Sequence, residues 1–362
     1  MIPYTRKTLP NGLTVVVNRD RASKLAAVNI IYRVGARNEN PARTGFAHLF
    51  EHLMFRGTRA VENFDLPVQM ASGDNNAFTN NDYTDFYITL PKDNLETALW
   101  LESDRMEGLD ITPAKLEAEK KVVIEEFRQR YLNQPYGDQT MLLRALAYKV
   151  HPYRWAAIGL ATDHIAGATL ADVESFYRAH YRPSNAILSI SADMEEERML
   201  ELAEKWFAPL ADHPSATAAI PQEPMQTQAR RQEVERDVPA STVTVAYHMC
   251  ARTKLDFYTA DLVSDLLSGG DSGRLYTHLV KERNLLSSVN AYITGDVDPG
   301  LFVFTGQLLP GVTPGEAEAA FREEIETLQT ASAAAREIEK VKNKFEANTL
   351  FGELNVMNKA MN

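Results

Sequence analysis

The order of strand and helix patterns in this 362-residue chain repeats on either side of one proline-rich segment. That segment, residues 212–230, places Pro214, Pro221 and Pro224 among Ala, Ser, Thr and Gln, a composition typical of a linker. A strand, a helix, further strands and further helices follow one another on both sides. The sequence therefore predicts an α+β fold of two homologous units. Each is expected to be an antiparallel or mixed sheet covered by helices, with 1–211 first, 212–232 as linker and 233–362 second.

The expected elements follow from two periodicities. Runs rich in β-branched and aromatic residues predict strands at 8–18 (entered through an Asn11-Gly12 turn), 26–34, 77–79, 83–90, 185–191, 242–248, 288–294 and 301–307. Apolar residues three to four apart, with helix-start signals, predict helices at 44–55, 95–106, 113–131, 171–181, 256–267, 274–282 and 333–350. The last helix is still running when the sequence nearly ends, so we expect the second unit to be C-terminally incomplete.

The charge of the chain limits its partners. The formal net charge is −11 and the sequence pI is about 5.3, whereas nucleic acids and anionic membranes require a basic surface. No run of about 18 apolar residues occurs, so we expect no membrane insertion. The N-terminus has no apolar signal core, but a leader could have been removed, and Cys250 alone can form no intrachain disulfide. Both the bacterial periplasm and the cytoplasm stay open as compartments.

The pentapeptide His-Leu-Phe-Glu-His at residues 48–52 lies inside the predicted helix 44–55. Histidines four residues apart project from one face of a helix, so His48 and His52 could bind one ion together. Glu51 would lie beside that face, where its carboxylate could accept a proton from a water acidified by the metal. The alternative is an amphipathic helix that exposes these polar side chains to solvent.

A catalytic zinc site needs three protein ligands and one open position. The predicted helix 113–131 offers Glu119 and Glu126, which are seven residues apart and therefore share a face. Valines between them indicate that this face packs inward, and a partly buried carboxylate requires a partner such as a metal. A solvated acidic helix accounts better for Glu117 and Glu125.

With its inverted H-x-x-E-H order, the chain resembles the pitrilysin and insulysin family of zinc peptidases, which includes mitochondrial processing peptidase. The family's third ligand is a glutamate in a downstream helix resembling E-x-x-V-I-x-x-E, and here EKKVVIEE runs from Glu119 to Glu126. The resemblance implies one zinc ion per chain, held by His48, His52 and Glu126. It further implies that Glu51 is the general base and that Glu119 assists catalysis by orienting a ligand histidine.

The resemblance continues in TLPNGLTVVV from Thr8 and in SGDNNAFTNNDYTDFYITLP from Ser72. The second stretch resembles the family's edge strand, which implies that Asn76, Ala77 and Phe78 bind substrate backbone by strand addition. The function implied is that of a zinc metalloendopeptidase acting on extended or unfolded peptides inside a chamber. A non-catalytic structural or processing-complex subunit is the alternative from another class, and a zinc hydrolase of other substrates is a third.

One departure from the family bears on its partners. Active members carry an Arg and a Tyr seven residues apart in a stretch like LREKRGLAYSV of the second copy. The matching stretch here, LVKERNLLSSV, places Val280 and Ser287 at those positions. We therefore expect a homologous partner subunit to supply the pair in a heterodimer, and a homodimer that works without the pair is the alternative.

Overall fold

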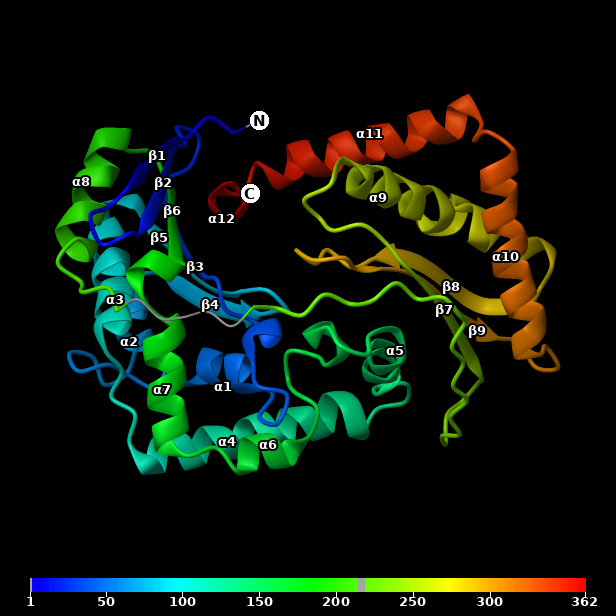
Figure 1. Cartoon of the computed structure of the whole chain (residues 1–362). Coiled ribbons are helices and arrows are strands. Elements are labelled where there is room, and N and C mark those ends of the chain that lie inside the picture. The colour runs from blue at the N-terminus through cyan, green and yellow to red at the C-terminus, as the bar shows by residue number, and fades with distance from the viewer. Residues whose placement is uncertain (1, 214–218) are drawn as a thin grey trace. The chain divides into compact units, whose positions relative to one another are not determined.

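The computed structural model describes residues 2–213 and 219–362, and these divide into two compact units (Figure 1). Unit 1 comprises Met1–Gln134, Tyr148–Thr227 and Gly352–Asn362, and unit 2 comprises Pro135–Ala147 and Gln228–Phe351. Both units are discontinuous in sequence. The predicted linker forms neither helix nor strand in its described part, and Pro214 lies outside the described residues.

Unit 1 is built on a six-stranded mixed sheet in which only β2 and β6 run parallel. In spatial order the strands are β1 (Thr5–Thr8), β2 (Thr14–Arg19), β6 (Ala186–Ala192), β3 (Leu25–Tyr32), β5 (Thr84–Pro91) and β4 (Asp74–Thr79). Gly12 turns the chain between β1 and β2 with a φ of 88°, so residues 9–13 of the predicted strand 8–18 form a hairpin turn instead. The strand β4 occupies one edge of the sheet.

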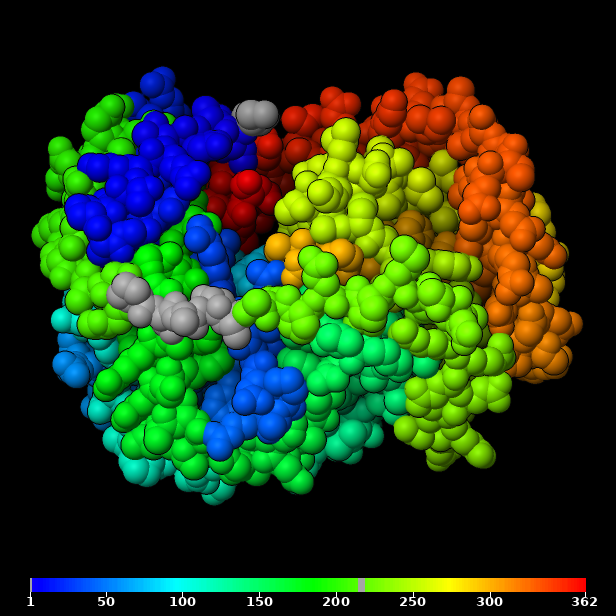
Figure 2. All heavy atoms as spheres, viewed as in Figure 1, coloured from blue at the N-terminus to red at the C-terminus, as the bar shows by residue number. Residues whose placement is uncertain are grey.

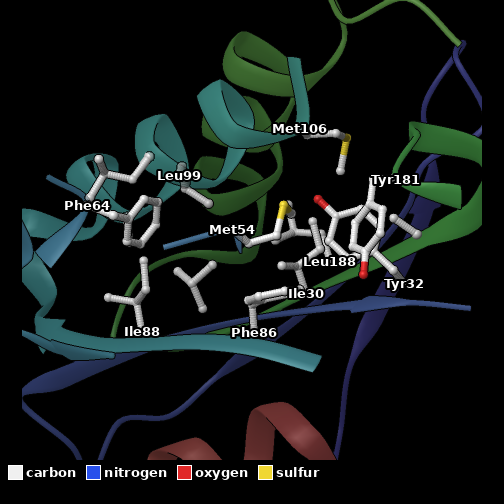
Figure 3. Close-up of a cluster of buried hydrophobic side chains, with 14 of the residues drawn as sticks. Ile30, Tyr32, Met54, Phe64, Phe86, Ile88, Leu99, Met106, Tyr181 and Leu188 are labelled. Atoms are coloured by element: carbon white, nitrogen blue, oxygen red, sulfur yellow. The ribbon is translucent and has the colours of Figure 1, made fainter. Parts of the chain in front are cut away.

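Helices cover both faces of this sheet. They are α1 (Phe46–Leu53), α2 (Asp65–Met70), α3 (Leu95–Glu107), α4 (Pro113–Phe127), α6 (Thr162–Ala166), α7 (Leu170–His180), α8 (Glu196–Phe207) and α12 (Val356–Met361). The predicted helix 113–131 is α4 followed by a π-helical turn at Arg128–Leu132. The main core lies between the sheet and helices such as α1 and α3, where Ile30, Phe86 and Leu99 pack together (Figure 3).

The opposite face of the sheet is covered by α12, a helix that the sequence patterns did not predict. Val356 and Met357 pack on Ala27 of β3, and Lys359 Nζ pairs with Asp20 Oδ1 at 2.8 Å. In Figure 2 the C-terminal residues (dark red) lie against the blue N-terminal part of unit 1.

Unit 2 contains a three-stranded antiparallel sheet in the order β7 (Thr242–His248), β9 (Leu301–Leu308) and β8 (Leu286–Ile293). Its helices are α5 (Gln139–Ala147), α9 (Leu255–Ser268), a π-helical segment at Tyr276–Glu282, α10 (Pro314–Thr330) and α11 (Ala335–Gly352). The expected α+β class is confirmed in both units. No helix in the described part of the chain has the length and hydropathy that crossing a membrane requires.

Three charged side chains lie within the core of unit 1. Arg105 of α3 donates from Nε to Oε2 of Glu102 at 2.8 Å, and its guanidinium lies 4.2 Å from the ring centroid of Phe86. Asp85 of β5 accepts a hydrogen bond from the side chain of Asn29 and is only 2% exposed. Because buried charges are costly unless they are paired, Arg105 and Glu102 stabilise each other, whereas Asp85 has only a neutral partner.

Burial raises the pKa of Asp85 from 3.8 to about 7, against the lowering effect of the Asn29 bond, and the negative charge of Glu102 adds to the rise. A carboxyl whose pKa is higher in the folded than in the unfolded chain stabilises the fold at low pH. This contribution is lost as the pH rises from about 4 through about 7. Asp85→Asn should remove this pH-dependent loss. Between pH 5 and pH 8.5 the free energy of unfolding of the variant, relative to that of wild type, should therefore rise by about 1–3 kcal/mol.

Urea unfolding followed by tryptophan fluorescence measures this, because all three tryptophans (Trp100, Trp155 and Trp206) belong to unit 1. Asp93→Asn, at an exposed position, is the matched control. The same pH dependence in both variants and wild type would contradict the assignment to Asp85.

Candidate metal centre

The histidines of the motif project from α1, a helix of two turns that packs against α4, α7, β4 and β5. Phe46, Leu49, Leu53 and Met54 turn their side chains into the core, as their spacing predicted, and Phe50 does so as well. This apolar face fixes which way the helix is rotated, and it leaves the two histidines on the side that meets α4. Short helices gain most of their stability from such packing.

The carboxylates come from α4, which begins at Pro113 after a Thr112 cap that accepts a hydrogen bond from Lys115 N. Glu119 is 1% exposed and the side chain of Glu126 is 18% exposed, so both face inward. Glu117 and Glu125 have side-chain exposures of 60% and 54% and face solvent. Glu119 and Glu126, seven residues apart, therefore share the inward face of the helix, and Glu117 and Glu125 lie on its exposed face, as expected.

Three ligand atoms meet between the helices. Glu126 Oε2 lies 3.6 Å from His48 Nε2 and 3.4 Å from His52 Nε2, and one atom from each residue falls within 4.8 Å of the others. These separations are longer than ordinary hydrogen bonds, which are about 2.7–3.2 Å. Two ligands of a tetrahedral zinc ion, each about 2.0–2.2 Å from the metal, are about 3.4 Å apart. The spacing and the His₂Glu donor set therefore fit a zinc ion.

Further side chains hold the ligands from outside. Glu119 Oε2 lies 3.4 Å from Nδ1 of His52, on the far side of the ring from Glu126, and Glu119 Oε1 lies 2.5 Å from Nη2 of Arg56. Nη1 of Arg130 lies 3.0 Å from the second oxygen of Glu126. Partners of this kind fix the tautomer and orientation of metal ligands.

The charges around the two rings favour a cation. Burial lowers the pKa of His52, but the nearby carboxylates of Glu119 and Glu126 outweigh it and raise the pKa to about 9. Burial and, to a smaller extent, the charge of His52 lower the pKa of His48 to about 4. His48 is therefore a neutral imidazole with a free electron pair, beside a site where two carboxylates attract positive charge. A divalent metal satisfies both conditions.

Glu51 lies on the same helix and reaches the sheet edge. Its Oε2 accepts a hydrogen bond of 2.6 Å from Oγ1 of Thr79, the last residue of β4. Burial raises the pKa of Glu51, while the bond from Thr79 lowers it. Glu51, His52, Glu119 and Asn76 line one open cleft in unit 1, so the candidate base, a ligand and one predicted substrate residue border the same space.

The other two predicted substrate residues, Ala77 and Phe78, follow Asn76 along β4. β4 pairs with β5 on one side only, in the register Ala77 opposite Phe86, and forms the edge of the sheet. The backbone N–H of Ala77 donates to Oδ1 of Asn76 at 2.8 Å. Phe78 is 36% exposed.

Sequence reasoning missed Thr79, Arg56 and Arg130. Thr79 directly follows the predicted substrate residues. Arg56 lies four residues after His52, and Arg130 lies four residues after Glu126. Four-residue spacing on a helix was the available signal for Arg130. Nothing in the spacing relates Thr79 to Glu51, because that bond depends on how β4 packs against α1.

Comparison with known proteins agrees with this geometry. The model of the insulinase family, peptidase family M16, matches residues 14–155, and the model of the peptidase M16 inactive domain matches residues 167–345. A zinc protease of Helicobacter pylori named PqqE is 32% identical over 345 residues, which cover 92% of this chain and 77% of that protein. A probable mitochondrial-processing peptidase subunit beta of Arabidopsis thaliana is 25% identical, with 83% and 59% covered.

Among solved structures, a protease from Helicobacter pylori superposes with a TM-score of 0.94 at 29% identity, covering 99% of this chain and 87% of that one. The first domain match contains the H-x-x-E-H motif and Glu126, and the second contains the sheet of unit 2. The chain therefore belongs to peptidase family M16, the insulinase family of zinc proteases.

Proposed function

We propose that this chain is a zinc metalloendopeptidase that hydrolyses extended or unfolded peptides, with Glu51 as general base. The observation that carries the proposal is the spacing of Glu126 Oε2, 3.6 and 3.4 Å from Nε2 of His48 and His52, which suits a shared zinc ion. Glu51 lies on the helix of the two histidines. A non-catalytic subunit would have no need of this complete set. The M16 zinc proteases to which the chain is similar support the same reaction class.

The residues divide the chemistry among them. Zinc, when bound, would supply a Lewis acid that polarises the scissile carbonyl and acidifies water. Glu51 would accept the proton of the attacking water and pass it to the leaving amine. Its partly buried carboxyl, with a raised pKa, is suited to both transfers because it takes up a proton more readily than an exposed glutamate does. Glu119 would keep His52 in the orientation that presents Nε2 to the metal.

The first prediction concerns the metal. The purified chain should bind one zinc ion. Without its partner it should cleave an unstructured quenched-fluorescent peptide only feebly, and a chelator should abolish that cleavage. His52→Ala should reduce zinc affinity by more than the roughly 10–100-fold that loss of an outer partner costs. His213→Ala, at an exposed position outside the site, is the control and should bind zinc like wild type. Zinc binding that survives in His52→Ala would exclude this site.

The second prediction concerns Glu51 and its bond to Thr79. Glu51→Gln should retain zinc and lose hydrolysis. Thr79→Val removes the donor that favours the charged carboxylate, so the acidic limb of the kcat/KM profile should move to higher pH. Thr89→Val in the adjacent strand β5 is the control. An identical pH profile in wild type, Thr79→Val and Thr89→Val would mean that the titrating group is not Glu51.

We further propose that Asn76, Ala77 and Phe78 bind the peptide backbone as an added strand. The support is that β4 is an edge strand and that its last residue, Thr79, contacts the proposed base. A substrate carbonyl could replace the Asn76 side chain as acceptor for the Ala77 N–H. Only an extended segment can present its backbone in this way, so folded substrates would be excluded.

Ala77→Pro tests this idea, because proline has no N–H to offer. KM for a linear peptide should rise about tenfold, in keeping with the loss of a backbone hydrogen bond. Zinc affinity and thermal stability should stay near wild type, which distinguishes a binding defect from unfolding. An unchanged KM in a folded, zinc-loaded variant would argue against strand addition at β4.

A homologous partner subunit is part of the proposal, with a heterodimer favoured over a homodimer. Val280 packs against the core of unit 2, and Ser287 donates its hydroxyl to Gln307 O, so neither offers the charge or phenol of an Arg and Tyr pair. The plant relative is itself named as a subunit. The peptide assay decides here too: full activity from the zinc-loaded chain alone would contradict a site completed by a different subunit.

A further inference from the structure

The helix that carries the motif begins at a residue that cannot cap it. Gly45 is the N-cap of α1, has a φ of 89°, and offers no side-chain hydrogen bond. A Cβ at this position would lie 2.6 Å from the carbonyl oxygen of Ile158, so glycine is required. The first N–H groups of a helix have no partner within the helix and are usually satisfied by a Ser, Thr, Asp or Asn at the N-cap. In α1 the acceptor must therefore come from elsewhere.

Glu39 supplies it. Its Oε2 accepts the N–H of Gly45 at 2.9 Å and its Oε1 accepts the N–H of Ala47 at 2.9 Å. Both oxygens are therefore hydrogen-bonded to the start of the helix. Trp155 Nε1 donates to Oε2 at 3.1 Å from the other side and also to the Ala36 carbonyl at 3.0 Å. Glu39 is 6% exposed and Trp155 is 1% exposed. Burial raises the pKa of Glu39 to about 8, although the N–H donors of Ala47, Gly45 and Trp155 lower it, so the negative charge that the helix dipole favours at this end is fully present only above that pH.

Two more bonds secure the approach to the helix. Thr44 N donates to His164 Nδ1 at 3.1 Å, and Leu160 N donates to Thr44 Oγ1 at 2.8 Å. The residue that follows Ala47 is His48, the first metal ligand. A displacement of the helix start would therefore move His48 directly, and a rotation would carry Glu51 and His52 with it, since all three share two helical turns.

We propose that Glu39 is a positioning residue of the metal centre, which fixes the place and rotation of α1 so that His48 and His52 meet Glu126 in a tetrahedral arrangement. The proposal rests on the metal site proposed above and assigns Glu39 no contact with substrate or metal. Gln at this position keeps the size of the side chain but places an NH₂ group against N–H donors, because both carboxylate oxygens are accepting. The substitution therefore loosens one of the two attachments without creating a cavity.

The test measures metal geometry and affinity rather than activity. Zinc affinity is obtained by competition with a chromogenic chelator, and Co²⁺ bound in place of zinc reports the ligand geometry through its visible absorption. Glu39→Gln should weaken zinc binding about 10–100-fold, the range typical of residues that orient metal ligands, and should alter the Co²⁺ spectrum. Trp155→Phe removes only one donor to Glu39 and leaves the helix bonds, so its effect should be in the same direction and smaller.

A matched control separates positioning from general destabilisation. Phe207→Leu in α8 trims the same hydrophobic core at a helix that packs on α3 and β2. At a similar loss of thermal stability this variant should keep wild-type zinc affinity and the wild-type Co²⁺ spectrum. If Glu39→Gln behaves like Phe207→Leu, Glu39 is only structural and the inference is overturned. If Glu39→Gln does not fold, an unchanged affinity and spectrum in Trp155→Phe overturns it. If the wild-type chain binds no zinc, the proposed function itself fails first.

Discussion

The pairing of α1 with α4 is the contact on which the candidate metal centre of unit 1 depends. It gathers two imidazoles and two carboxylates into a partly buried space, and buried charge is tolerated only where it is matched. Each helix is fixed by an apolar face, with Leu49 and Val123 turned toward the core. The polar faces of the two helices therefore cannot turn away from each other. The negative charge of their carboxylates is not fully balanced by the histidines, so this space attracts a cation.

How far the sequence predicts this site depends on the range of each contact. The helix of the H-x-x-E-H motif and the inward face of α4 follow from local spacing, and both were predicted. Spacing alone could not decide whether Glu119 or Glu126 is the third metal ligand, because residues seven apart share one face. The family resemblance assigned their roles. The structure places Glu126 between the two Nε2 atoms and Glu119 behind His52, at Nδ1.

The contacts that were not predicted join elements far apart in the chain. Thr79 meets Glu51 across 28 residues, and Trp155 meets Glu39 across 116. No periodicity encodes such bonds, since they exist only after the sheet and helices have packed. The helices α8 and α10 were missed for a different reason. Their charged surfaces dominate the local pattern, and the few buried residues in each, such as Phe207 and Phe321, are recognisable only from the cores that they fill.

The two discontinuous units set a condition on how this chain can be divided. A fragment that stops in the segment after α8 would lack α12 and leave the Ala27 face of its sheet open to water. The same fragment would carry residues 135–147, which belong with unit 2 and would have nothing to pack against. During synthesis, too, the first sheet is completed only by residues made 164 positions after its last strand, since β6 ends at Ala192 and α12 begins at Val356. The two halves of the sequence are therefore not two independent folding modules, although each contains most of one.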